Sequence, residues 1–223
     1  MCHGRKHDHG DQGGGTIDHP RAYEALAAVI LAGRRRRMYT RMAELSGVRP
    51  GDRVLDVGCG TGYLTRLVAP RVGPGGRVTG LDASAPMIEY ARRRAPGDCS
   101  YVVGEGQDMP LPDSSFDVVV SSFAVHHIPA SARAATVREM FRVLRPGGRL
   151  LIAEFRPPRG HAVEHVLNAL FGPALRTGMR ELLPGLCAEA GFQVERVEPF
   201  RPVSFHLVAV RPAADREPAN GPS

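Results

Sequence analysis

Short apolar runs alternate with amphipathic segments through the middle of the chain. Near-continuous apolar runs of strand length occupy residues 53–57, 77–82, 99–105, 115–123 and 149–155. The segments between them have helical spacing. The clearest is a stripe at i, i+3, i+4 and i+7, formed by Val137, Met140, Phe141 and Leu144. Strands that alternate with helices of this length predict a parallel α/β sheet.

The pattern changes on both sides of this region. Residues 1–18, rich in His and Gly, are predicted to be a disordered tail, and residues 19–47 a helical cap whose second, basic helix covers 34–45. After residue 155 an apolar helical face at 163–171 and a short helix that begins at Pro184 are expected. Two apolar runs at 192–200 and 203–210 predict an antiparallel hairpin. The prediction is a Rossmann-like, doubly wound, mostly parallel sheet of seven strands within a domain at 48–211, followed by a loose tail at 212–223.

Composition adds limits rather than a function. The 223 residues are 43% hydrophobic, and neither a membrane-spanning run nor a secretory signal is expected. The four cysteines have no paired spacing, which favours a reduced, cytoplasmic compartment. The net charge of +6 comes from arginine, because Lys6 is the single lysine, and a coding bias would explain that excess. The cluster at 34–37 is therefore either a solvated helix face or a contact for anions or a membrane surface, and peripheral membrane contact stays open.

A glycine-rich turn between the first strand and the first core helix carries the most chemistry. The stretch "VLDVGCGTGYLT" holds Gly58, Gly60 and Gly62 in G-x-G-x-G spacing, whereas a dinucleotide fingerprint reads G-x-G-x-x-G. Asp56, two positions before the first glycine, would repel a pyrophosphate and would suit a cationic amino group. Asp82 ends the next strand, where a carboxylate can accept hydrogen bonds from ribose hydroxyls. The two carboxylates predict a nucleoside that has a charged amino-acid end and no phosphates.

Four motifs in order then give a family resemblance. They are "VLDVGCGTG", "VTGLDAS", "GEGQDMPLPDSSFDVVVSSFAVHHI" and "EMFRVLRPGGRLLIAEF". The region from about residue 51 to 210 resembles class I S-adenosylmethionine-dependent methyltransferases, in the small-molecule group that includes quinone-biosynthesis C-methyltransferases. The resemblance implies S-adenosyl-L-methionine as cofactor and a small, in one option lipophilic, acceptor whose O, N or C atom is methylated.

The resemblance also implies site residues. The methionine moiety is assigned to Asp56 and to the backbone of Gly58 and Gly60, and the ribose to Asp82. The adenine is assigned to Ala83, Met87, Glu105 and Gly106, and Ser121, Ser122 and Phe123 are placed beside the methionine end of the cofactor. Cys59 and Gly62 of the glycine turn complete the set of residues expected to bind the cofactor. Glu105 and Gly106 depart from the usual Asp and Ala, so Gln107 or Asp108 could share the adenine contact. The other interpretations are that Asp56 caps the loop, Asp82 caps the next helix, Met87 fills the core and the serines merely end a strand.

No metal is predicted, because the sulfonium of the cofactor already activates the methyl group for transfer. A base is needed only when the acceptor must lose a proton, and His126 and His127 are the candidates; packing at the strand end is the alternative. Enzymes of this superfamily that methylate nucleobase amino groups typically carry an Asn- or Asp-Pro-Pro-aromatic motif after the fourth strand. Here that position reads "SSFAVHH", so a nucleic-acid substrate is not expected. The apolar segment at 159–183 is either part of an acceptor lid or packs on the sheet.

Two alternatives of another class remain. One is a nicotinamide-dependent oxidoreductase, which the glycine spacing and Asp56 oppose. The other is a partner or regulatory protein that binds the cofactor without catalysis. The sequence leaves the oligomeric state and the acceptor open.

Overall fold

A computed structural model describes residues 19–30, 33–155, 178–200 and 204–213. Several predictions fall outside these ranges: the disordered tail at 1–18, the helical face at 163–171, most of the acceptor-lid segment and most of the tail at 212–223.

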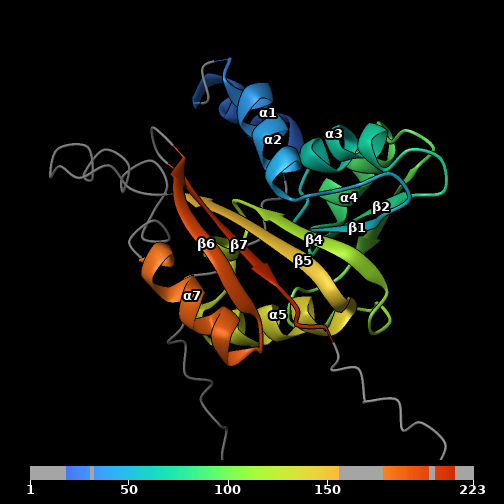
Figure 1. Ribbon diagram of the computed structural model, residues 1–223. Coiled ribbons are helices and arrows are strands. Elements are labelled where there is room, and N and C mark those ends of the chain that lie inside the picture. The colour runs from blue at the N-terminus through green and yellow to red at the C-terminus, as the bar shows by residue number, and fades with distance from the viewer. Residues whose placement is uncertain (1–18, 31–32, 156–177, 201–203, 214–223) are drawn as a thin grey trace, which may run out of the picture.

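The core is one seven-stranded sheet in the order β3-β2-β1-β4-β5-β7-β6 (Figure 1). The pairs β3–β2, β2–β1, β1–β4 and β4–β5 are parallel, whereas β7 is antiparallel to both β5 and β6. The strands are β1 (Arg53–Val57), β2 (Arg77–Asp82), β3 (Cys99–Val103), β4 (Phe116–Ser122), β5 (Leu144–Phe155), β6 (Gln193–Phe200) and β7 (Ser204–Val210). The predicted doubly wound, mostly parallel sheet with a C-terminal hairpin is confirmed.

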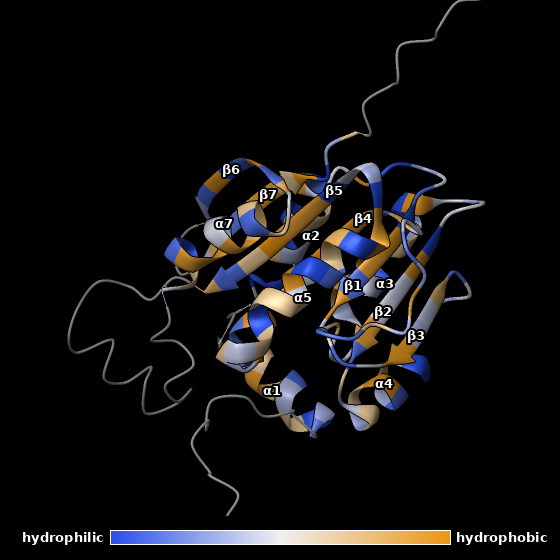
Figure 2. Ribbon diagram, turned by 90° about the horizontal axis from the view of Figure 1, so that it is seen from below, coloured by the Kyte–Doolittle hydropathy of each residue, from blue (hydrophilic) through white to orange (hydrophobic). Residues whose placement is uncertain are grey.

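Helices cover both faces of the sheet, as Figures 1 and 2 show. They are α1 (Pro20–Ile30), α2 (Arg35–Leu45), α3 (Tyr63–Val72), α4 (Ala85–Arg92), α5 (Ala130–Val143) and α7 (Met179–Glu189), with a 3₁₀ turn, η1, at Val125–His127. One core cluster joins the sheet to α5 and α7 through Val137, Met140 and Leu183. The other joins it to α2 and α3 through Met42 and Val68. Two covered faces explain why the central strands are mostly apolar (orange in Figure 2).

Two predicted boundaries were wrong. Helix α7 begins at Met179, so Pro184 lies inside it and not in its first turn. The ring nitrogen of Pro184 cannot donate the helical hydrogen bond, but Met179, Leu183 and Cys187, at i, i+4 and i+8, are buried together and hold the helix across that gap. Strand β5 begins at Leu144, which pairs with Phe116 before the register shifts at the glycine-containing turn.

None of the helices in the described parts of the chain is both long and apolar enough to cross a bilayer.

Candidate cofactor and acceptor site

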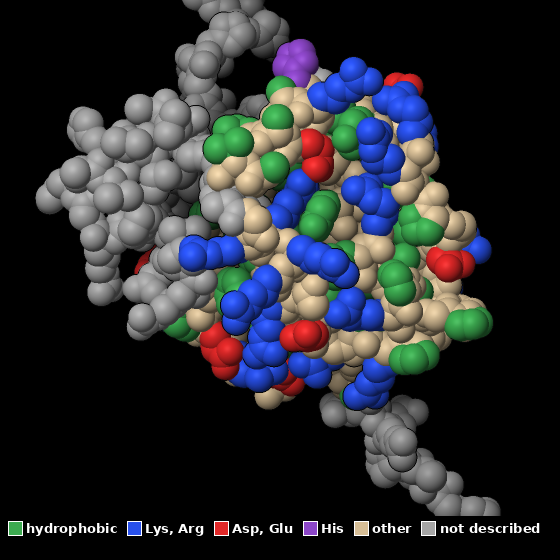
Figure 3. Space-filling model, turned by 90° about the horizontal axis from the view of Figure 1, so that it is seen from above, with side chains coloured by type: hydrophobic (Ala, Val, Ile, Leu, Met, Phe, Trp, Pro, Cys, Tyr) green, Lys and Arg blue, Asp and Glu red, His purple; other side chains and the backbone are tan. Residues whose placement is uncertain are grey.

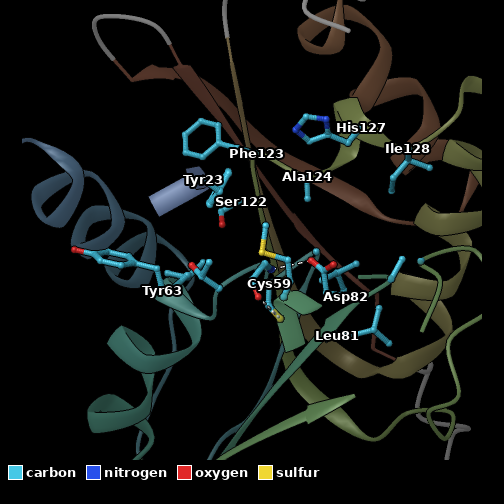
Figure 4. A pocket seen from close by; sticks show the side chains of 18 of the residues that line it. Tyr23, Cys59, Tyr63, Leu81, Asp82, Ser122, Phe123, Ala124, His127 and Ile128 are labelled. Atoms are coloured by element: carbon cyan, nitrogen blue, oxygen red, sulfur yellow. Dashed lines mark hydrogen bonds between the residues drawn. The ribbon is translucent and has the colours of Figure 1, made fainter. Parts of the chain in front are cut away.

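A cavity of about 380 Å³ opens at the carboxyl ends of the parallel strands, where an α/β sheet places its ligand (Figure 4). Its wall is formed by the turns that follow β1, β2, β3 and β4, together with side chains from α1, α2 and α3. The strand order reverses at β1 and β4, and the glycine turn lies at this point. The fold therefore brings three of the four motif regions to the cavity wall, whereas the fourth, at residues 139–155, contributes no lining residue.

The glycine turn is shaped by two different requirements. Gly58 has φ 70°, and a Cβ added there would lie 2.3 Å from the Cβ of Ala124, so the turn and the β4 loop could not both keep their places. Gly60 has φ 52°, and a Cβ added there would meet no atom within 4 Å. Gly58 is required by packing, whereas Gly60 presents bare backbone to the open cavity.

Asp82 links this turn to the tip of β2. Its Oδ2 accepts the N–H of Gly60 at 2.8 Å, and its Oδ1 accepts the N–H of Ser84 at 2.9 Å. The N–H groups of Gly58 and Cys59 both donate to the carbonyl of Leu81, at 2.8 and 3.0 Å. These bonds fix the Asp82 carboxylate in the cavity wall, next to the bare backbone of Gly60 (Figure 4).

Three predicted site residues, Asp56, Gly62 and Ser121, are not part of the cavity wall. Asp56 is fully buried behind the turn, where its Oδ2 accepts the hydroxyl of Thr65 at 2.7 Å and its Oδ1 has no hydrogen-bond partner among the described residues. Burial raises the pKa of this carboxyl to about 7. Gly62 caps the start of α3 with φ 71°, and the Ser121 hydroxyl donates to the Val57 carbonyl at 2.9 Å.

The four residues assigned to adenine, Ala83, Met87, Glu105 and Gly106, all line the cavity. Met87 is 2% exposed, so it belongs to the core as well as to the cavity. A Cβ added to Gly106 would lie 3.0 Å from Cγ2 of Thr136 on α5, so a larger residue would require Thr136 to shift. Glu105 is exposed and accepts a long hydrogen bond of 3.5 Å from the Gln107 side chain.

Phe123 has a strained backbone at the end of β4. Its φ of 54° is unusual for a residue with a side chain, and such strain is often held at functional sites. The Phe123 N–H donates to the Ala153 carbonyl at 2.8 Å, and the ring lies 4.4 Å from that of Phe155 between centroids. The conformation directs an aromatic ring to the cavity, beside Ser122.

The two histidines have different positions. His126 is 4% exposed, and its Nδ1 lies 2.7 Å from Oε2 of the fully buried Glu154, whose Oε1 accepts the Val125 N–H at 2.8 Å. His127 lines the cavity, with its ring centroid 4.0 Å from that of His126. Burial, and the neighbouring His126, lower the pKa of His127 to about 4. The imidazole of His127 is therefore neutral at neutral pH, with a free ring nitrogen lone pair but a lower basicity than that of an exposed histidine.

Sequence reasoning missed the contribution of the first two helices. Tyr23 of α1 and Arg35 and Tyr39 of α2 line the cavity, and the Arg35 guanidinium lies 3.8 Å from the ring centroid of Tyr63. The sequence does place these aromatic and basic residues within the predicted helical cap. Helical spacing alone, however, does not show which edge of the sheet a helix covers.

Glu24 ties these helices to the glycine turn. Its carboxylate accepts two hydrogen bonds from Arg35, at 2.5 and 2.9 Å, and a third from the hydroxyl of Thr61 in the turn. These contacts hold the pKa of Glu24 below its usual value against the opposing effect of burial. We call the set Glu24, Arg35 and Thr61 the α1 clasp.

Within the described ranges, no group of three or more His, Cys, Asp or Glu side chains is arranged to hold a metal ion. Burial raises the pKa of the Cys59 thiol, so this cavity-lining cysteine stays protonated and unreactive.

Comparisons with known proteins agree with this geometry. A family described as "Methyltransferase domain" matches residues 54–148. The chain is 38% identical over 141 residues to the demethylmenaquinone methyltransferase of Symbiobacterium thermophilum, covering 61% of this chain and 55% of that protein. It is 42% identical over 135 residues to the ubiquinone/menaquinone biosynthesis C-methyltransferase UbiE of Ectopseudomonas mendocina, covering 58% and 52%. The chain thus spans about half the length of these curated relatives.

Solved structures share the fold. A SAM-dependent methyltransferase from Aquifex aeolicus aligns with a TM-score of 0.71 at 22% identity, covering 86% of this chain and 98% of that one. The [4+2]-cyclase SpnF aligns with a TM-score of 0.67 at 21% identity, covering 80% and 81%. Residues 54–148 thus match a methyltransferase family, and the fold is the one that solved S-adenosylmethionine-dependent methyltransferases share. SpnF shows that this fold also serves another reaction, so the fold alone does not identify the chemistry.

Proposed function

We propose that this protein transfers a methyl group from S-adenosyl-L-methionine to a small, apolar, aromatic acceptor. The observation that carries the proposal is the composition of one cavity. Its wall holds the bare backbone of Gly60 and the carboxylate of Asp82 in one part, and the ring of Phe123 and the imidazole of His127 in another (Figure 4).

The residues present fit the cofactor. Gly60 leaves open space where a Cβ would stand, so a ligand can approach the turn closely. Asp82 offers a fixed carboxylate to ribose hydroxyls, and Ala83 and Met87 offer apolar surface to a flat base. When bound, the cofactor supplies an electrophilic methyl group on a sulfonium. The protein has to align the acceptor with it and exclude water.

The proposed acceptor follows from the remaining wall and from the relatives. Phe123, Tyr39 and Tyr63 form an aromatic group, with ring centroids 6.2 Å apart for Tyr39–Phe123 and 5.0 Å apart for Tyr39–Tyr63. Aromatic walls favour a flat, apolar ring as the acceptor. The relatives named above are quinone-biosynthesis enzymes, which supports an aromatic quinone precursor that is methylated on carbon.

In this proposal His127 is the general base. Methylation of a phenol-type ring at carbon or oxygen requires the loss of one proton from the acceptor, and the neutral imidazole of His127 receives it. His126 does not reach the cavity wall, and its bond to the buried Glu154 makes it a positioning residue for the ring of His127 stacked on it.

The test is transfer of labelled methyl from S-adenosyl-L-methionine into an extract of small apolar metabolites, followed by identification of the labelled product. We expect label in an aromatic product that carries one additional methyl group. Calorimetry with S-adenosyl-L-methionine and with NAD runs in parallel. Binding of S-adenosyl-L-methionine without transfer to any acceptor would favour a cofactor-binding partner protein instead.

A further inference from the structure

An apolar stripe lies on the outer side of α1. Ala22, Ala25, Leu26 and Val29 follow the i, i+3, i+4, i+7 spacing of one helix face, and all four are exposed, Leu26 by 50% and Val29 by 76%. The other side of the same helix carries Tyr23 to the cavity and Glu24 to the clasp. The stripe is therefore held outward by the contacts that hold α1 in place.

Exposed arginines follow this stripe closely in the chain. Arg34, Arg36 and Arg37, at the start of α2, are exposed, and within the described residues no acidic side chain forms a salt bridge with them. The sequence from 25 to 43 contains no Asp or Glu at all. Figure 3 looks onto the side of the molecule where α1, α2 and α3 lie in Figure 1, and Arg side chains (blue) spread over it among a smaller number of acidic ones (red).

We propose that this surface, made of Ala22, Ala25, Leu26, Val29, Arg34, Arg36 and Arg37, docks on an anionic lipid bilayer. An interfacial helix immerses a shallow apolar face while neighbouring arginines contact lipid phosphates. Here the apolar face and the arginines are both exposed, and the ion pair between Glu24 and Arg35 joins the two helices that carry them. A protein partner is less well matched, because the stripe holds only small aliphatic side chains and no aromatic anchor. The inference does not depend on the methyl-transfer reaction.

The test is flotation of the purified full chain with vesicles of phosphatidylcholine alone and of phosphatidylcholine with phosphatidylglycerol. We expect binding to the anionic vesicles that weakens as salt rises. The variant Leu26→Glu/Val29→Glu removes the apolar stripe and should abolish binding. Arg36→Gln/Arg37→Gln should weaken it roughly 30-fold, or about fivefold for each arginine near the surface.

Matched controls lie on the other side of the molecule. Leu182→Glu changes an exposed leucine of α7, and Arg138→Gln/Arg196→Gln removes two exposed arginines of α5 and β6. Both should bind vesicles as the unchanged protein does, and circular dichroism should report the same fold for all variants. Equal binding by the stripe variant and its control, or no binding to anionic vesicles at low salt, would overturn the proposal. So would a folded dimer that Leu26→Glu/Val29→Glu converts to monomer, because the stripe would then be a subunit interface.

Discussion

Asp82 matters at the scale of single residues because it touches both the glycine turn and the cavity. Replacing Asp82 with Ala should weaken cofactor binding by about 1–3 kcal/mol, because hydrogen bonds to a charged acceptor are lost. Calorimetry with S-adenosyl-L-methionine measures this. Asp98→Ala, which changes an exposed carboxylate at the other end of the sheet, is the control. Unchanged affinity in Asp82→Ala would show that the ribose does not lie there.

Alanine substitutions at Gly58 and at Gly60 should affect different quantities, namely the free energy of unfolding and the affinity for the cofactor. Gly58→Ala places a methyl group against Ala124 and keeps a left-handed φ, so we expect a loss of unfolding free energy above the roughly 1–2 kcal/mol of the backbone term. Adding Ala124→Gly should restore the part that is due to the clash. Gly60→Ala should lose only the backbone part but should reduce cofactor affinity more. Chemical denaturation and calorimetry give the two quantities, and equal unfolding energies for Gly58→Ala and Gly60→Ala would contradict the packing argument.

Replacing His127 should distinguish a role as general base from a purely structural role. His127→Gln should lower kcat by about 100-fold or more while cofactor affinity is kept, because a general base typically contributes a factor of 10²–10⁴. The acid limb of the unchanged enzyme should lie near pH 4 and not near 6.5, since the pKa of His127 is lowered to about 4. The limb should vanish in the variant. A limb near 6.5 would assign the proton transfer to another group.

At the scale of elements, the α1 clasp decides whether the first helix stays on the cavity. Glu24→Gln leaves the buried guanidinium of Arg35 without its charge partner. We expect hydrogen exchange in residues 20–30 to become faster by the equivalent of about 1–3 kcal/mol, with little change in global stability. Glu44→Gln breaks the exposed pair with Arg41, so it should have almost no effect. Equal exchange in the two variants would mean that other contacts hold α1.

The elements also show what sequence can predict. The strands and the glycine turn were predictable, because fully covered strands read as apolar runs and the turn needs glycines. The predicted start of α7 was wrong because proline is favoured in the first turn of a helix, and the helix was therefore expected to begin at Pro184. Burial of Met179 and Leu183 stabilises the longer helix instead. The sites of Tyr23 and Arg35 could not be predicted, because they depend on the packing of two separate helices. The cavity-facing position of Asp82 followed from the parallel sheet, but the burial of Asp56 behind the turn did not.

At the scale of the whole molecule, three buried groups make stability depend on pH. His127 and His206 have pKa values lowered to about 4 by burial, so between pH 4 and 6.5 each binds a proton only in the unfolded chain. Asp56 has a pKa raised to about 7 and in this range binds a proton only in the folded chain. The net of the three is one proton more in the unfolded state, so stability should rise with pH by about 1.4 kcal/mol per unit.

Denaturation at a series of pH values between 4 and 6.5 tests this balance. His206→Asn removes one of the two histidine contributions and should flatten the slope, because the remaining histidine and Asp56 then cancel. Replacing both histidines should reverse the sign. His19, at the exposed start of the described chain, provides a control whose replacement should leave the slope unchanged.

The position of β7 has a consequence for synthesis on the ribosome. This strand comes after β6 in the chain but lies between β5 and β6, and its buried Phe205, Leu207 and Ala209 complete the core of that half of the sheet. Among the strands in the described ranges, β6 is hydrogen-bonded to β7 alone. A nascent chain that has reached Phe200 therefore still exposes the edge of β5. The last part of the sheet can form only after residue 210 has left the exit tunnel, although the glycine turn was made more than a hundred residues earlier.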